Sequence, residues 1–168
     1  MGETAQKISK VDKNKLLELL NVAFAEEWLA YYQYWIGAQV ATGPMRITII
    51  GEFLEHANEE LDHAKKLSNR ILQLGGTPII NPLEWEKKAQ CKYEEPSDSF
   101  VLTLIKQNLQ AERCAIGRYQ QICDMCHGKD YETFKLSEHI LHEEIDHEQE
   151  MEDFLQDFQV ALKRMANK

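Results

Sequence analysis

The sequence predicts an all-α domain, an antiparallel four-helix bundle with a long crossover between its second and third helices. Only eight glycines and four prolines occur in 168 residues, and clusters of turn residues fall at a few points that separate four long stretches. Within these stretches apolar residues recur at intervals of three and four, which is the period of one helix face. No stretch combines strict alternation with enrichment in β-branched residues, so we expect no strands.

Turn residues set the bounds of the predicted helices, which cover about 13–42, 45–74, 98–126 and 130–165. Pro44 is expected in the first turn of the second helix, and Gly75-Gly76 ends that helix. The run from Ser97 to Ser99 offers several N-caps for the third helix.

The connections after the first and third helices are short, so each should close an antiparallel hairpin. The middle connection, about 75–97, is long and carries a short amphipathic piece at Leu83–Ala89. A long crossover between two hairpins is a standard four-helix topology. The length suits one domain, so we expect residues 1–168 to form a single unit.

The charge balance excludes some partners. Lys and Arg total 19 against 28 Asp and Glu, a formal net charge of -9, which argues against general DNA or membrane binding despite the lysines near the N-terminus (Lys7, Lys10, Lys13 and Lys15). The N-terminus does not resemble a signal peptide, and no apolar run approaches a membrane span. We therefore expect a cytoplasmic protein whose four cysteines start as thiols.

A doubled motif points to the chemistry. Glu60-Leu-Asp-His63 lies in the second predicted helix and Glu144-Ile-Asp-His147 in the fourth. Residues three apart share a helix face, so each Glu projects beside its His. Glu59 and Glu143 compete for the same role as partners four residues from each His.

The wider spacing joins the motifs into one site. Glu27 precedes Glu60 by 33 positions, and Glu112 precedes Glu144 by 32. In an antiparallel hairpin of such helices, that offset brings each lone Glu level with the motif across the pair. Glu26 is adjacent to Glu27, and helix phase read from the sequence leaves both open as the ligand.

Packed face to face, the two hairpins would place four carboxylates and two imidazoles at one depth in the core. Such carboxylates would resist ionisation unless two divalent cations offset them, +4 against -4. Carboxylate and imidazole ligands suit iron and manganese. The candidate ligands of a di-iron or di-manganese centre are Glu27, Glu60, His63, Glu112, Glu144 and His147.

This pattern, over residues 10–165, resembles the ferritin-like superfamily with a bacterioferritin-type di-iron site, and is similar to the Dps-like thioferritins. The resemblance implies that Glu60 and Glu144 bridge the two metals. It also implies a site tyrosine at Tyr34, seven residues after Glu27. Bacterioferritins bind haem through a methionine after the first bridging Glu, but position 61 is Leu, so we expect no haem.

The same resemblance implies a redox cysteine pair at Cys91 and Cys114. Cys123-Asp-Met-Cys126 is a lone pair of cysteines at the end of a helix, and we interpret it as structural. The rubredoxin domain of rubrerythrins needs two such motifs, so that domain is not expected.

The resemblance implies a ferroxidase that oxidises Fe(II), preferably with hydrogen peroxide rather than dioxygen, and stores Fe(III) mineral in a dodecameric cage as protection against oxidative stress. The helical piece between the second and third helices and a chain stopping near residue 165 favour twelve subunits. Two alternatives remain open: a di-iron peroxidase or manganese catalase that stores nothing, and a DNA-compacting Dps-like protein.

Overall fold

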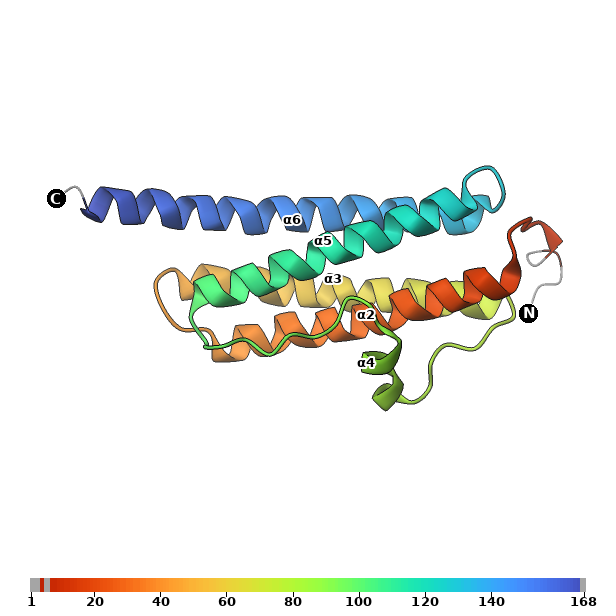
Figure 1. Cartoon of the computed structure of the whole chain (residues 1–168), viewed down its shortest axis with the longest axis horizontal. Coiled ribbons are helices and arrows are strands. Elements are labelled where there is room, and N and C mark those ends of the chain that lie inside the picture. Colours follow the sequence, from red (N-terminus) through yellow and green to blue (C-terminus); the bar gives the residue numbers. More distant parts are fainter. Residues whose placement is uncertain (1–3, 5–6, 167–168) are drawn as a thin grey trace.

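A computed structural model describes residues 4 and 7–166 of the chain (Figure 1). Residues 1–3, 5–6 and 167–168 lie outside the described part, and with them most of the N-terminal segment on which the expected lack of a signal peptide rests. The helices are α2 (Lys13–Val40), α3 (Arg46–Gln73), α4 (Trp85–Lys88), α5 (Val101–Cys126) and α6 (Tyr131–Ala166), with a 3-10 turn, η1, at Pro82–Glu84. The predicted fold class, a four-helix bundle with a helical piece in the crossover, is confirmed.

The turn between α2 and α3 differs from the prediction. Pro44 lies before α3 instead of in its first turn, because the chain passes through left-handed conformations at Gly43 (φ 109°) and Met45 (φ 59°). A helix cannot continue through such residues, so α3 begins only at Arg46.

The start of α5 also differs, by about three residues. The segment before α5 is held against the α2–α3 turn, where the Thr42 N–H donates to Ser99 O (2.8 Å) and the Val101 N–H donates to Thr42 O (2.9 Å). The Asp98 carboxylate accepts from the Phe100 N–H at 2.8 Å. These contacts keep residues 98–100 out of the helix, and Phe100 is the N-cap.

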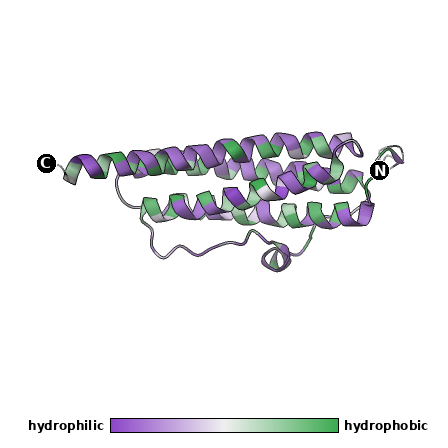
Figure 2. Cartoon of the chain, turned by 45° about the horizontal axis from the view of Figure 1, so that its top comes forward, coloured by the Kyte–Doolittle hydropathy of each residue, from purple (hydrophilic) through white to green (hydrophobic). Residues whose placement is uncertain are grey.

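The core consists of two apolar clusters, one in each half of the bundle. One cluster gathers the first half of α2 and the second half of α3, including Leu20 and Ile71, with Ile122 and Ile140 from the other hairpin. The second cluster gathers the opposite ends of the same helices, including Phe53 and Ile105. Figure 2 shows apolar and polar residues alternating along the whole length of each long helix, as expected for helices with one face in the core. The middle of the bundle, between the clusters, is left for polar side chains.

A buried ion pair closes one end of the bundle. The Arg70 guanidinium donates to both carboxylate oxygens of Asp130 at 2.8 and 2.9 Å, and to the Thr133 hydroxyl at 2.8 Å. Asp130 also accepts from the Thr133 N–H, which caps the start of α6. The pair therefore joins the end of α3 to the beginning of α6.

The crossover segment, residues 75–100, runs along the outside of α2 from one end of the bundle to the other (Figure 1). The Trp85 ring stacks on Trp28 with centroids 5.0 Å apart and planes 3° apart, which seats α4 on α2. Within the described ranges, none of the helices is long and apolar enough to cross a membrane.

Two glycine substitutions should change stability in opposite directions. Gly43→Ala forces a side chain into a left-handed conformation and puts its Cβ 2.5 Å from the Phe100 ring, so we expect a loss of about 1–3 kcal/mol. Gly51→Ala, inside α3, meets no described atom within 4 Å, and alanine's helix propensity should add about 0.5–1 kcal/mol. Guanidinium unfolding at one protein concentration measures both, and a Gly43→Ala variant as stable as the parent chain would contradict this account of the turn.

Candidate metal centre

The structure brings all six candidate ligands together in the middle of the bundle. Each long helix contributes: α2 and α5 one carboxylate apiece, and α3 and α6 a Glu and a His apiece. All six side chains are buried, with at most 4% of each residue exposed: Glu27, Glu60, His63, Glu112, Glu144 and His147.

These residues form two groups that could each hold a cation. One contains Glu27, Glu60, His63 and Glu144, and the other contains Glu60, Glu112, Glu144 and His147. Within each group the donor atoms lie within 4.8 Å of one another. Glu60 and Glu144 belong to both groups, so the two positions share two carboxylates.

Each imidazole turns its Nδ1 atom toward the carboxylates. His63 Nδ1 lies 3.4 Å from Glu27, 3.0 Å from Glu60 and 3.2 Å from Glu144. His147 Nδ1 lies 3.7 Å from Glu60, 3.6 Å from Glu144 and, at 3.9 Å, from Glu112. The carboxylates and ring nitrogens thus converge on two adjacent points.

The outer nitrogen of each imidazole is held by a carboxylate from the opposite helix. His63 Nε2–H donates to Glu143 at 2.9 Å, and His147 Nε2–H donates to Glu59 at 2.8 Å. Metal-bound histidines commonly make this kind of bond, which fixes the ring and its tautomer. Glu59 and Glu143 therefore lie outside the centre, as partners of the histidines and not as competitors of Glu60 and Glu144.

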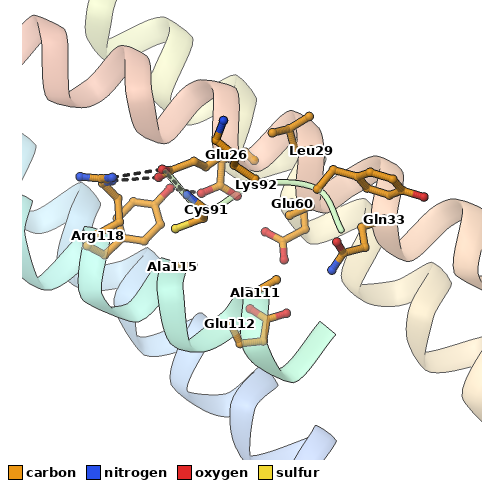
Figure 3. Close-up of a pocket in the computed structure, with 14 residues that line it drawn as sticks. Glu26, Leu29, Gln33, Glu60, Cys91, Lys92, Ala111, Glu112, Ala115 and Arg118 are labelled. Carbon is orange, nitrogen blue, oxygen red and sulfur yellow. Dashed lines mark hydrogen bonds and ion pairs between the residues drawn. The ribbon is translucent and has the colours of Figure 1, made fainter. Parts of the chain in front are cut away.

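The structure separates Glu26 from Glu27. Glu27 lies in the centre, 3.4 Å from His63 Nδ1. Glu26 instead pairs with Arg118 at 2.8 Å (Figure 3), and it accepts backbone N–H bonds from Gln90 and Cys91. Glu26 thus anchors the crossover segment to α2 and α5. No local pattern in the sequence distinguishes the two residues, because the partners of Glu26 lie 64 to 92 positions away.

Two tyrosines hold the lone carboxylates. The Tyr34 hydroxyl, expected near the centre, donates to Glu112, and the Tyr119 hydroxyl donates to Glu27. Both tyrosines are fully buried. Tyr119 is missing from our sequence interpretation, although it follows Glu112 by the same seven positions that separate Tyr34 from Glu27.

Comparison with known proteins agrees with this architecture. Residues 17–161 match the ferritin-like domain family. The chain belongs to that family. The DNA protection during starvation protein of Pyrococcus furiosus is 40% identical over 147 residues, which are 86% of this chain and 79% of that protein.

Solved structures of other proteins resemble this ferritin-like chain, and two of them serve for comparison. A dodecameric thioferritin from Bacteroides fragilis, a bacterioferritin-related protein, is 45% identical, with a TM-score of 0.95 over 97% of this chain and 98% of that one. Dps from Thermosynechococcus elongatus is 19% identical, with a TM-score of 0.81 over 91% of this chain and 95% of that one, and shows the shared fold.

The centre is reached from two faces of different chemistry. On the α2–α5 side, a cavity of about 20 Å³, room for roughly one water, lies under the crossover segment and reaches Glu27, Glu60 and Glu112 (Figure 3). On the α3–α6 side lies a pocket of about 170 Å³ that we call the acidic pocket. Its lining residues are Glu52, Glu55, His56, Glu59, Glu143, Asp146, His147 and Glu150.

A disulfide ties the crossover segment over the first of these faces. Cys91 in that segment is bonded to Cys114 in α5, with Cα atoms 5.6 Å apart. Cys91 also lines the cavity that reaches Glu27. Cys123 and Cys126 are buried thiols, and burial raises the pKa of Cys126 to about 12, which suits a packing role.

Burial and mutual repulsion dominate the electrostatics of the ferritin-like centre. Burial and the charge of Glu112 raise the pKa of Glu144 to about 7, and burial with the charge of Glu144 raises the pKa of Glu60 well above its ordinary value. Burial opposes protonation of His63 and His147, but the hydrogen bonds that their ring N–H groups donate to the surrounding carboxylates outweigh it and raise both pKa values. Without metal cations, protons on the two imidazoles and on the carboxyl groups of raised pKa reduce the charge of the centre.

A matched pair of variants tests the assignment of the two adjacent glutamates. Glu26→Gln leaves the buried Arg118 without its counter-charge, so we expect a loss of stability of about 3 kcal/mol with cation binding retained. Glu27→Gln removes one of four mutually repelling carboxylates, so the cation-free protein should keep its stability while Co²⁺ affinity falls at least about tenfold. Guanidinium unfolding in chelator and Co²⁺ titration measure the two effects. If Glu26→Gln weakens Co²⁺ binding more than Glu27→Gln does, the assignment is wrong.

Proposed function

We propose that the protein binds two iron ions at this centre, oxidises Fe(II), preferably with hydrogen peroxide, and stores the Fe(III) product inside a dodecameric cage in the cytoplasm. The observation that carries the proposal is the pair of four-residue donor groups that share Glu60 and Glu144. Carboxylate bridges between two positions are typical of di-iron carboxylate bundles. Removal of Fe(II) together with peroxide would protect the cell against oxidative damage.

The charges of the donor set fit two Fe(II) ions, since four carboxylates balance +4. The centre supplies two electrons when both ions are oxidised, which matches one peroxide: two Fe(II), one H₂O₂ and two protons give two Fe(III) and two waters. Tyr34 and Tyr119 hold the terminal carboxylates in place, and Glu59 and Glu143 orient the imidazoles. The same donors also suit manganese, so the choice of iron is itself part of what we propose.

The acidic pocket supports delivery of cations to the centre. It is lined by carboxylates from α3 and α6 and reaches His147. A concave surface of one charge sign concentrates ions of the opposite sign. Fe(II) is therefore expected to approach from the α3–α6 face.

Exposed apolar side chains support assembly into a homo-oligomer. Ile47, Ile80, Leu83 and Met165 are each at least 74% exposed. Assembly would remove such surface from water. The dodecameric state of the relative from Bacteroides fragilis favours twelve copies here. The net charge of -9 opposes the alternative of DNA compaction.

Iron loading tests the storage function. Cation-free protein given Fe(II) and peroxide should take up far more than two irons per chain, co-eluting with a particle of about twelve chain masses. Glu60→Ala and Glu144→Ala should each abolish rapid oxidation while the bundle stays folded, because both positions lose a shared carboxylate. Iron that stops at two per chain on a monomer or dimer would favour the non-storing peroxidase.

Proton release provides a second test of the centre. Since the pKa values of His63, His147, Glu60 and Glu144 are all raised, these groups hold protons that a bound cation displaces, so binding two Zn²⁺ near neutral pH should release at least two protons per chain. Affinity should fall as the pH is lowered. Calorimetry in buffers with different ionisation heats measures the release, and pH-independent affinity without proton release would exclude the two histidines as ligands.

A further inference from the structure

The centre has an internal two-fold pattern that can be followed along the sequence. Residues of the second hairpin repeat those of the first at an offset of 84 or 85 positions. Each pair plays the same part in both halves, and the pairs are Glu27 with Glu112, Tyr34 with Tyr119, Glu59 with Glu143, Glu60 with Glu144, and His63 with His147.

This pattern breaks at His56. The residue 84 positions later is Ile140, which is fully buried in an apolar cluster. The carboxylate that bonds to His56 is Glu150, and its counterpart 84 positions earlier is Lys66. The pair formed by His56 and Glu150 therefore has no counterpart in the repeat, because the corresponding positions hold Ile140 and Lys66.

His56 is held in the same way as the two histidines of the centre. Its Nε2–H donates to Glu150 at 2.7 Å, as those of His63 and His147 donate to carboxylates of the opposite helix. The residue is 2% exposed, and within the described part of the chain its buried Nδ1 has no hydrogen-bond partner. Buried polar atoms usually have partners, and an inner nitrogen left open behind an outer carboxylate bond is the arrangement of a metal-binding histidine.

The position of His56 identifies the cation site that it would join. Its ring stacks on His147 with centroids 4.0 Å apart and planes 18° apart. Donor atoms of His56, Glu112 and His147 lie within 4.8 Å of one another. Two ligands on opposite sides of an ion with bonds of about 2.1 Å lie about 4.2 Å apart, so small side-chain rotations would bring all three onto one ion.

We propose that His56 is an additional ligand of the cation held by Glu112 and His147, so that the two metal positions are chemically different. The inference rests on the proposed metal centre. The position of His63 has one imidazole, whereas the position of His147 has two. Nitrogen donors favour later first-row cations such as Co²⁺ and Zn²⁺, so the position of His147 should fill first with these ions.

The test is the order in which Zn²⁺ fills the centre. With one Zn²⁺ per chain, anomalous diffraction from crystals of the whole protein should place the ion at the position of His147, with His56 Nδ1 at about 2.1 Å. Calorimetry should show two binding steps that differ at least about tenfold in affinity. In His56→Leu, the tighter step should weaken at least about tenfold and the other should stay unchanged.

Two further variants separate ligation from packing. His56→Gln can keep the hydrogen bond to Glu150 but lacks the imidazole donor, so it should behave like His56→Leu. His127→Ala removes an exposed histidine from the turn before α6 and should bind Zn²⁺ like the parent chain. If His56→Gln retains the tight step, His56 acts through packing and the inference fails.

The outcomes distinguish the inference from the proposed centre. If the parent protein binds no Zn²⁺ at the six residues, both fail. If it binds two Zn²⁺ while His56 stays more than about 3 Å from the ions, or if His56→Leu changes neither step, the centre stands and the inference is overturned.

Discussion

The compensation of four buried carboxylates is the constraint on which the rest of this structure depends. Glu27, Glu60, Glu112 and Glu144 meet where water is excluded, and each raises the cost of ionising its neighbours. The pKa of Glu144 is raised to about 7 and that of His63 is also raised, so the centre binds protons that reduce this repulsion. Divalent cations bound by the same donor atoms would also reduce the repulsion, so protons and metal ions would compete for one set of atoms. A site of this kind is selective for cations because of its electrostatics and its geometry together.

A polar centre of this kind costs stability, and the length of the helices offsets that cost. Each long helix extends past the centre in both directions and buries apolar residues on either side, such as Leu20 in one cluster and Phe53 in the other. Burial of a large apolar side chain stabilises a fold by about 1.5–3 kcal/mol, and two clusters supply many such residues. The carboxylates repel one another, but packing and the hydrogen bonds from Tyr34 and Tyr119 can therefore hold them in place. Shorter helices would leave the charged layer at the end of a small core.

Sequence periodicity and spacing predicted the bundle and the convergence of the six residues, because both follow from helix geometry. The parts that could not be predicted depend on long-range contacts. Glu26 and Glu27 are identical adjacent residues that differ in their long-range partners. Glu26 binds Arg118 and the backbone of the crossover segment, which leaves Glu27 for the centre. The start of α5 depends on the α2–α3 turn, which no propensity of Ser97–Ser99 reveals. Tyr119 could have been predicted from the sequence, because the repeat that relates Glu27 to Glu112 also relates Tyr34 to Tyr119.

The two faces of the centre differ in the size and the charge of their openings. On the α2–α5 face, the Cys91–Cys114 disulfide and the Glu26–Arg118 pair fasten the crossover segment over a cavity with room for about one water. On the α3–α6 face, carboxylates line a wider pocket whose charge attracts cations. Because His56 lines that pocket and stacks on His147, the imidazole that breaks the two-fold pattern lies on the cation side. The chemical difference that we propose between the two metal positions is thus aligned with the difference between the two faces.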